Sequence, residues 1–231
     1  MQGKIHSFQS LGTVDGPGVR AVVFMQGCPL RCACCHNPDT WDTDGGRLVS
    51  AEEIFRKIQR LRAYFGKDGG VTVSGGEPLL QADFVAELFS LCRADGINGA
   101  LDTSGCIYNE SVERLLSLTD LVLLDYKYTN DEDYKKYTGM SKQSADAFLE
   151  RLSALGKRVW IRQVLIPTLN DSEESVSRLY ALEDRYSCIE KIELLPFRKL
   201  CIEKYRTLGI SFPLEDIPEA SDELIERLRK H

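Results

Sequence analysis

The chain alternates short apolar runs with longer stretches in which apolar residues recur every three or four positions. The short runs predict β-strands over residues 20–26, 71–73, 99–102, 121–126, 158–166 and 191–195. The longer stretches have the period of helices with one apolar face, and they predict helices over residues 50–64, 79–94, 109–118, 141–155, 172–186 and 220–229. Ser50 and Glu53 form a capping-box sequence at the start of the first of these helices.

Strands such as 121–124, Leu-Val-Leu-Leu, are apolar at every position, which is typical of a parallel sheet covered by helices on its faces. Six strand–helix units are too few for a closed eight-stranded barrel. The pattern therefore predicts an α/β fold with an open, partial TIM-type (β/α)6 barrel, helices outside, in a single domain over residues 1–231. In parallel barrels the working residues follow the carboxyl ends of the strands.

Composition narrows the classes of function. Of the 231 residues, 43% are hydrophobic and 28% are charged, and the formal net charge is −6, which argues against a nucleic-acid-binding surface as the main activity. No apolar run approaches membrane-spanning length, and the first residues have no apolar signal-peptide core. We therefore expect a cytoplasmic protein, in which cysteines stay reduced and are more often metal ligands than disulfides.

Four of the eight cysteines fall within residues 28–35, directly after the first predicted strand. Cys28, Cys32 and Cys35 have the spacing C-x3-C-x2-C. Three thiolates on one loop can bind three irons of a 4Fe–4S cluster and leave the fourth iron open for a small-molecule ligand. A zinc site is the alternative, since Cys34 or His36 could complete four ligands, but the second cysteine pair usual in such sites does not follow. We favour the cluster.

Polar residues follow three other predicted strands. In Ser74-Gly75-Gly76-Glu77 the two glycines would let the backbone approach a ligand and Glu77 would supply an acceptor. The alternative is a plain strand-to-helix turn with Glu77 in the first helical turn. Asp102 and Asp125 end apolar strands, where a carboxylate needs a partner. Each could instead cap a helix or pair with a neighbouring basic residue.

The chain resembles the radical S-adenosylmethionine (SAM) enzymes and, within them, the organic radical-activating enzymes of the pyruvate formate-lyase type. Besides the cysteine triad, the matching stretches are residues 12–20, 35–41, 73–78, 101–105, 124–127, 159–162 and 192–197. The resemblance implies that SAM fills the open iron of the cluster. It implies cofactor-binding roles for Cys34, His36, Gly75, Gly76, Glu77, Asp102, Asp125, Tyr126, Lys127, Arg162, Val164 and Arg198. It also implies a monovalent-cation site formed by Asp102, Thr103, Leu123 and Asp125, and a contact of Asp15 with the protein substrate.

In activity, the resemblance implies reductive cleavage of SAM to methionine and a 5′-deoxyadenosyl radical, which removes hydrogen from a glycine of pyruvate formate-lyase in anaerobic metabolism. It implies flavodoxin or ferredoxin as electron donor and a monomer that binds neither nucleic acid nor membrane. No cysteine lies between Asn37 and Ser74, which favours this type over activators that carry extra clusters. The alternatives are an activator of another glycyl radical enzyme, a radical enzyme for a small molecule, and a non-enzymatic metal-binding module.

The sequence departs from the family pattern at two positions. The residue between the second and third cluster cysteines is usually aromatic, and here it is Cys34. The residue after Pro196-Phe197 is often histidine, and here it is Arg198. Both departures put contacts to the nucleoside in doubt and leave the three cysteines and Glu77 unaffected.

Overall fold

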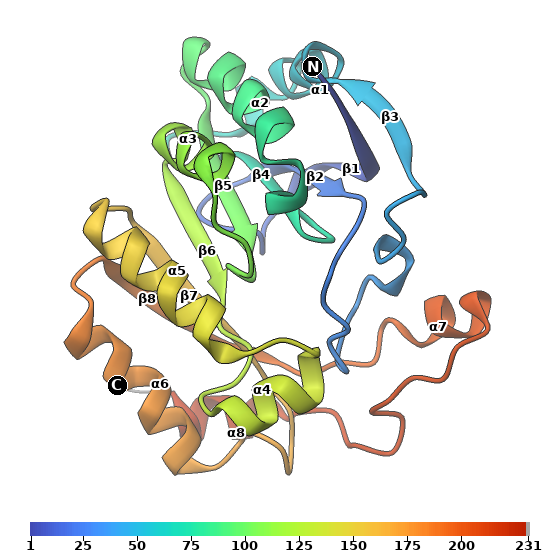
Figure 1. Cartoon of the computed structure of the whole chain (residues 1–231), viewed down its shortest axis with the longest axis vertical. Coiled ribbons are helices and arrows are strands. Elements are labelled where there is room, and N and C mark those ends of the chain that lie inside the picture. The colour runs from blue at the N-terminus through green and yellow to red at the C-terminus, as the bar shows by residue number, and fades with distance from the viewer. Residues whose placement is uncertain (230–231) are drawn as a thin grey trace. The chain divides into compact units, whose positions relative to one another are not determined.

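The structure, a computed structural model, describes residues 1–229, and its strands form a mostly parallel sheet that does not close on itself (Figure 1). The hydrogen-bonded order is β3-β1-β2-β4-β5-β6-β7-β8. The strands are β1 (Gln2–Gly12), β2 (Arg20–Met25), β3 (Arg47–Ser50), β4 (Gly70–Gly75), β5 (Asn98–Thr103), β6 (Leu121–Asp125), β7 (Val159–Leu165) and β8 (Ile189–Pro196). An open α/β sheet containing all six predicted strands confirms the predicted fold class. β1 and β3 were not predicted.

Each predicted helix has a counterpart in the structure, and two of them are divided into an α-helix and a 3₁₀ helix. The α-helices are α1 (Ala51–Gln59), α2 (Ala82–Ala94), α3 (Glu110–Leu118), α4 (Asp131–Thr138), α5 (Lys142–Ala154), α6 (Glu173–Arg185), α7 (Ile202–Leu208) and α8 (Asp222–Leu228). Short 3₁₀ helices are η1 (Pro38–Thr40), η2 (Arg62–Tyr64) and η3 (Pro78–Gln81). The first two predicted helices each divide, into α1 with η2 and into η3 with α2. The sequence did not predict α4 and α7.

The chain divides into two compact units. Unit 1 comprises Met1–Pro29 and Thr40–Leu123, and unit 2 comprises Leu30–Asp39 and the chain from Leu124 onward. The cysteine loop therefore contributes to both units. The single domain expected from the sequence stays a prediction.

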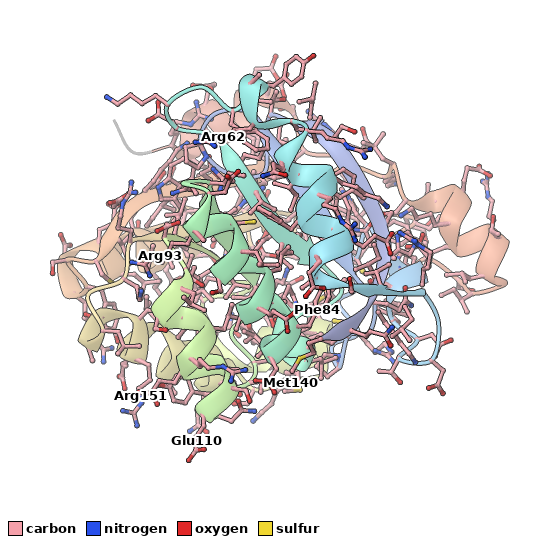
Figure 2. The ribbon with its side chains drawn as sticks, turned by 90° about the horizontal axis from the view of Figure 1, so that it is seen from above. Arg62, Phe84, Arg93, Glu110, Met140 and Arg151 are labelled. Carbon is pink, nitrogen blue, oxygen red and sulfur yellow. The ribbon has the colours of Figure 1, made fainter. Side chains whose placement is uncertain are left out.

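Unit 1 is built on three parallel strands extended by a hairpin. β2, β4 and β5 pair in parallel, and β1 pairs antiparallel with both β2 and β3. Ala21, Val22 and Val23 are fully buried, as expected for a strand covered on both faces. Figure 2 shows α1, α2 and α3 side by side over the sheet, with Phe84 on α2. The ring of Phe84 occupies the space where a side chain at Gly3 would lie, so β1 packs closely against α2.

Unit 2 holds the parallel pair β7 and β8, with α5 and α6 beside it (Figure 1). The buried faces of these helices include Phe148, Leu149 and Leu152 on α5 and Val176 and Leu179 on α6. Within residues 1–229, no helix has the length and apolar character needed to cross a membrane.

Candidate functional site

The four clustered cysteines lie on an irregular loop between β2 and η1. All are partly exposed, and none of the eight cysteines within residues 1–229 forms a disulfide. In unit 1, the loop begins with Gly27, whose N–H donates to the carbonyl of Thr40 at 2.8 Å, and with Cys28, whose N–H donates to Trp41 at 3.4 Å. These bonds hold the start of the loop beside its end, so Cys28 has a fixed backbone.

Unit 2 carries the other cysteines. The N–H of Cys35 donates to the carbonyl of Cys32 at 3.0 Å, which makes a tight turn between two of the predicted ligands. Arg31 and Ala33, on either side of Cys32, donate their N–H groups to the carbonyls of Thr138 and Tyr137 at 2.9 and 2.8 Å. The end of α4, which the sequence did not predict, therefore supports the segment that carries Cys32.

Cys34 and His36 lie in the same segment. Burial raises the pKa of the Cys34 thiol to about 11, although the Lys127 ammonium opposes this shift. His36 is exposed, and its Nε2 donates to the carbonyl oxygen of Arg198 at 2.9 Å. The Nε2 of His36 is therefore already bonded to the backbone of Arg198.

Glu77 is the most completely bonded carboxylate near the strand ends of unit 1. It is 1% exposed and caps η3 by accepting from the N–H of Leu79 at 3.1 Å. It also accepts from the hydroxyl of Thr103 at 2.6 Å, and from the N–H and hydroxyl of Ser104 at 3.0 and 2.5 Å. Since a carboxylate has about four acceptor positions, these four bonds occupy it. Glu77 therefore ties the end of β4 to the end of β5, and its contact with SAM stays a prediction.

The two glycines before Glu77 are needed by the protein backbone itself. A Cβ on Gly75 would lie 2.4 Å from the backbone nitrogen of Met25, and Gly75 has a φ of +105°. A Cβ on Gly76 would lie 2.2 Å from the carbonyl oxygen of Gly27. Only glycine fits both positions, because the end of β2 and the start of the cysteine loop pass directly against them.

Asp102 and Asp15 lie on one face of β4. Asp102, at the end of β5, accepts a hydrogen bond from the Ser74 hydroxyl at 2.6 Å. The hydroxyl of Thr72 donates to the carbonyl of Asp15 at 2.6 Å. Residues two apart on a strand share a face and are separated by ~7 Å. The Asp15 loop therefore lies on the same face of β4 as Asp102. It lies nearer to the amino end of β4 than the cysteine loop does.

A buried arginine holds the Asp15 loop in this position. Arg20 is fully buried, and its guanidinium donates to the hydroxyl of Thr72, to the carbonyl of Pro17 and to the side chain of Asn98. Burial lowers its pKa to about 10, so the side chain stays charged at neutral pH.

In unit 2, the residues after β6 point in different directions. Asp125 forms an ion pair with Lys127 at 2.5 Å. Burial alone would lower the pKa of Lys127, but the charges of Asp125, Cys32 and Cys34 outweigh it and raise that pKa well above its usual value. Tyr126, between them, turns to α5, where its hydroxyl donates to Asp146 at 2.5 Å. Lys127 thus lies near the cysteine segment, whereas the side chain of Tyr126 does not face it.

The remaining predicted cofactor residues are bonded within unit 2. The carbonyl of Arg162 accepts the N–H of Tyr126 at 2.9 Å, and its guanidinium lies 3.5 Å from Glu193. The carbonyl of Val164 accepts from the side chain of Asn170 at 2.9 Å. Arg198 reaches the carbonyl of Ala220 and, at 2.9 Å, the carboxylate of Asp222 beside α8. The guanidinium of Arg198 is therefore engaged by α8.

The predicted metal ligands belong partly to unit 1 and partly to unit 2. Among residues 1–229, no group of three or more histidine, cysteine, aspartate or glutamate side chains is arranged to hold a metal ion. Of the predicted cation ligands, Asp102 and the hydroxyl of Thr103 bond to Ser74 and Glu77, and Asp125 bonds to Lys127. Leu123 is buried in β6. Both ligand sets therefore stay predictions.

Sequence reasoning missed Ser104, Tyr128 and Lys204. Ser104 completes the Glu77 bonds, and the preceding strand end was the only signal for it. Lys204, on α7, reaches Asn37 at 2.8 Å and Asp39 at 3.1 Å, directly after the cysteine loop. Tyr128 is buried beside the same segment, and no short motif marks it.

Comparisons with known proteins place these features in a family. A family model described as the radical SAM superfamily matches residues 22–179. The pyruvate formate-lyase-activating enzyme of Clostridium pasteurianum is 46% identical over 100% of this chain and 97% of its own length. The pyruvate formate-lyase 1-activating enzyme of Escherichia coli K12 is 41% identical over 98% of this chain and 94% of its own length. The chain belongs to the pyruvate formate-lyase-activating family of radical SAM enzymes.

Solved structures support the fold of this family. A domain of a pyruvate-formate lyase-activating enzyme from Bacteroides vulgatus has a TM-score of 0.57 and 23% identity, covering 69% of this chain and 90% of that one. A radical SAM methyltransferase from Sphaerobacter thermophilus has a TM-score of 0.65 and 18% identity, covering 90% of this chain and 62% of that one. At these identities the likeness concerns the fold alone. The predicted family and the prediction of an enzyme are confirmed by the family match and by the two relatives.

Membership of the radical SAM family implies a 4Fe–4S cluster and SAM. The donors present suit such a cluster, because thiolates are its usual ligands and three partly exposed cysteines outside any disulfide share one irregular loop.

Proposed function

We propose that this enzyme activates a pyruvate formate-lyase by generating a radical on one of its glycines. The observation that carries the proposal is the C-x3-C-x2-C loop directly after β2, in a chain 46% identical over its whole length to a pyruvate formate-lyase-activating enzyme. When bound, the cluster and SAM supply a one-electron cleavage that gives methionine and a 5′-deoxyadenosyl radical, and this radical takes a hydrogen atom from the glycine Cα.

We assign the cluster to Cys28, Cys32 and Cys35. The turn between Cys32 and Cys35 and the backbone bonds of Arg31 and Ala33 support this assignment, because they hold two thiols on one short segment before any iron binds. Cys34 is a neighbour of the cofactor rather than a ligand, as the family resemblance implies.

We assign the binding of methionine to two regions. Lys127 holds the carboxylate of SAM, since it is charged, lies near Cys32 and Cys34, and is kept in place by Asp125. Gly75, Gly76 and Asp102 hold the amino group through backbone carbonyls and a carboxylate. Glu77 acts mainly by fixing this turn, because its own oxygens are already bonded.

Other assignments follow the family resemblance. Arg162 and Val164 contact the nucleoside together with His36. Tyr126 and Arg198 support the site indirectly, through their bonds to α5 and α8. Asp102, Thr103, Leu123 and Asp125 bind a monovalent cation once SAM is present. Asp15 contacts the protein substrate. A flavodoxin or ferredoxin supplies the electron, and the enzyme works as a monomer in the cytoplasm.

The test is anaerobic reconstitution followed by incubation with SAM, a reductant and a pyruvate formate-lyase. Electron paramagnetic resonance (EPR) should then show a glycyl radical on the partner, and no radical should form with the Cys28→Ala, Cys32→Ala or Cys35→Ala variant. A signal with another glycyl radical enzyme, and none with pyruvate formate-lyase, would change the partner but not the chemistry. SAM cleavage that stays uncoupled from every such partner would contradict the proposal.

A further inference from the structure

Tyr128 carries a buried hydroxyl for which the protein provides no partner. The residue follows β6 and is 2% exposed, and its hydroxyl makes no hydrogen bond within residues 1–229. A buried, unpaired polar group costs free energy, and native proteins rarely keep one without a reason. The hydroxyl is therefore a candidate donor to a group that is not part of the chain.

The ring of Tyr128 is fixed against the support of the cysteine loop. It stacks on the ring of Tyr137, with centroids 5.3 Å apart and an interplanar angle of 28°. The carbonyl of Tyr137 accepts the N–H of Ala33, the residue between Cys32 and Cys34. One residue of α4 thus contacts both the tyrosine ring and the cysteine segment, which places Tyr128 beside that segment.

Burial keeps the hydroxyl of Tyr128 protonated. Burial raises the pKa of Tyr128, and the nearby thiols of Cys34 and Cys32 raise it further. The same two cysteines act on Lys127, the neighbour of Tyr128 in sequence. A protonated hydroxyl close to sulfur is a hydrogen-bond donor, and sulfur is an acceptor for it.

Other groups near the ring are already engaged. Asp133 and Tyr137 also face it electrostatically. Asp133 accepts a hydrogen bond from Asn130 at 2.6 Å, and the hydroxyl of Tyr137 interacts with the ammonium of Lys136. Of the groups that act on the Tyr128 hydroxyl electrostatically, those of the cysteine segment are left as candidates near its missing partner.

We propose that the hydroxyl of Tyr128 donates a hydrogen bond to sulfur at the Cys32 corner of the 4Fe–4S cluster and thereby raises the reduction potential of the cluster. This inference rests on the proposed function, in which Cys32 is a cluster ligand. Hydrogen bonds to the sulfurs of a cluster stabilise its more negative, reduced state, and they are one means by which a protein sets the potential. Tyr128 is thus a tuning residue outside the ligand set.

The test compares Tyr128→Phe with Tyr137→Phe, since both remove one hydroxyl and keep the stacked pair. In the reconstituted enzyme, a redox titration followed by EPR should give a more negative midpoint potential for Tyr128→Phe. Tyr137→Phe should match the wild type. Equal potentials for Tyr128→Phe and the wild type would overturn the inference.

A second measurement does not depend on the cluster. In the full chain without iron, Tyr128→Phe should leave the melting temperature unchanged or raise it, because the variant removes an unpaired buried hydroxyl. A lower melting temperature would mean that the hydroxyl has a partner in the apoprotein, such as a buried water, and would also overturn the inference. If the wild type itself binds no cluster, the proposed function fails, and that outcome is visible before any variant is compared.

Discussion

Glu77 in unit 1 and Asp125 in unit 2 are both acidic residues beside the carboxyl end of a β-strand, but they are stabilised in different ways. Glu77 is almost completely buried and accepts four hydrogen bonds, all from uncharged donors. Asp125 is partly exposed and forms an ion pair with Lys127. Hydrogen bonds from fixed backbone and hydroxyl groups hold a turn rigid, whereas a partly exposed ion pair can be rearranged by a charged ligand.

Glu77 and Asp125, to which the family resemblance gives roles in one cofactor site, therefore act in different ways. Glu77 fixes the geometry of the turn that contains Gly75 and Gly76. Asp125 keeps Lys127 charged and oriented near Cys32 and Cys34. We therefore expect substitutions at Glu77 to affect mainly folding, and substitutions at Lys127 to affect mainly binding.

The largest effect should come from Glu77→Ala. The variant leaves two N–H groups and two hydroxyls of Leu79, Thr103 and Ser104 without their acceptor in a buried position. We expect the free energy of unfolding to fall by ~3–5 kcal/mol, since each lost bond to a charged group contributes about 1.5–3 kcal/mol and part of the loss is relieved by relaxation. Denaturant unfolding of the apoprotein measures it.

The matched control is Glu87→Ala, on α2. Glu87 pairs with the N-terminal ammonium at 2.7 Å but is partly exposed, so its removal should cost less than about 1 kcal/mol. If Glu77→Ala were no more destabilising than this control, the structural role assigned to Glu77 would be wrong.

Lys127→Met should act mainly on the binding of SAM and less on the stability of the protein. Replacing a charged hydrogen-bond donor to the SAM carboxylate should weaken SAM binding by roughly 10- to 100-fold, from a loss of about 1.5–3 kcal/mol. Calorimetric titration of SAM into the cluster-loaded protein measures this change. Lys57→Met provides the control, because Lys57 pairs with Glu53 on the exposed side of α1. Unchanged SAM affinity in Lys127→Met would remove Lys127 from the binding site.

The positions of these acidic residues could be predicted from the sequence, but their hydrogen-bond partners could not. The strand ends that carry Glu77, Asp102 and Asp125 follow from apolar runs, and the start of α1 follows from its capping residue. Ser50 accepts the backbone N–H of Glu53, as predicted, whereas the N-caps Asn109 and Ser172 were not predicted as caps. The partners of Glu77 could not be predicted, because Thr103 and Ser104 lie 26 and 27 residues away in sequence.

The missed elements had weak periodic signals. β1 is largely polar and partly exposed, with Ile5 the apolar residue buried within it, so it lacks the continuous apolar run that identified the other strands. α4 buries only Tyr134 and Thr138 among its eight residues. It is marked instead by its ends, with Asn130 as the N-cap and Gly139 in the left-handed conformation after the last turn. This short helix nevertheless supports the cysteine segment.

A smaller effect is expected for Tyr126→Phe. The Tyr126 hydroxyl lies 2.5 Å from Asp146 and 3.1 Å from Lys142, and its loss should lower the free energy of unfolding by about 1–2 kcal/mol. SAM affinity should change by less than threefold, since the side chain faces α5. Tyr186→Phe is the control, because that hydroxyl lies 3.5 Å from Glu150 and should contribute little. A large loss of SAM affinity in Tyr126→Phe would mean that the tyrosine is part of the binding site.

The smallest effect concerns Asp131, which joins α4 to the start of α5 and so lies behind the support of the cysteine segment. Its carboxylate pairs with Lys135 at 2.7 Å and accepts from the hydroxyl of Ser141 and the N–H of Lys142. These partners, Lys135 first, lower its pKa to about 2. A depressed pKa in the folded state stabilises the protein above the unfolded-state pKa of ~3.9, and this contribution is lost as the pH falls toward about 2.

Asp131→Asn should therefore differ from the wild type in melting temperature at pH 6 and converge with it as the pH falls through that interval. Asp44→Asn, at a highly exposed carboxylate, is the control and should show no convergence. A difference for Asp131→Asn that is constant from pH 6 to pH 2 would show that the carboxylate acts through its shape rather than its charge.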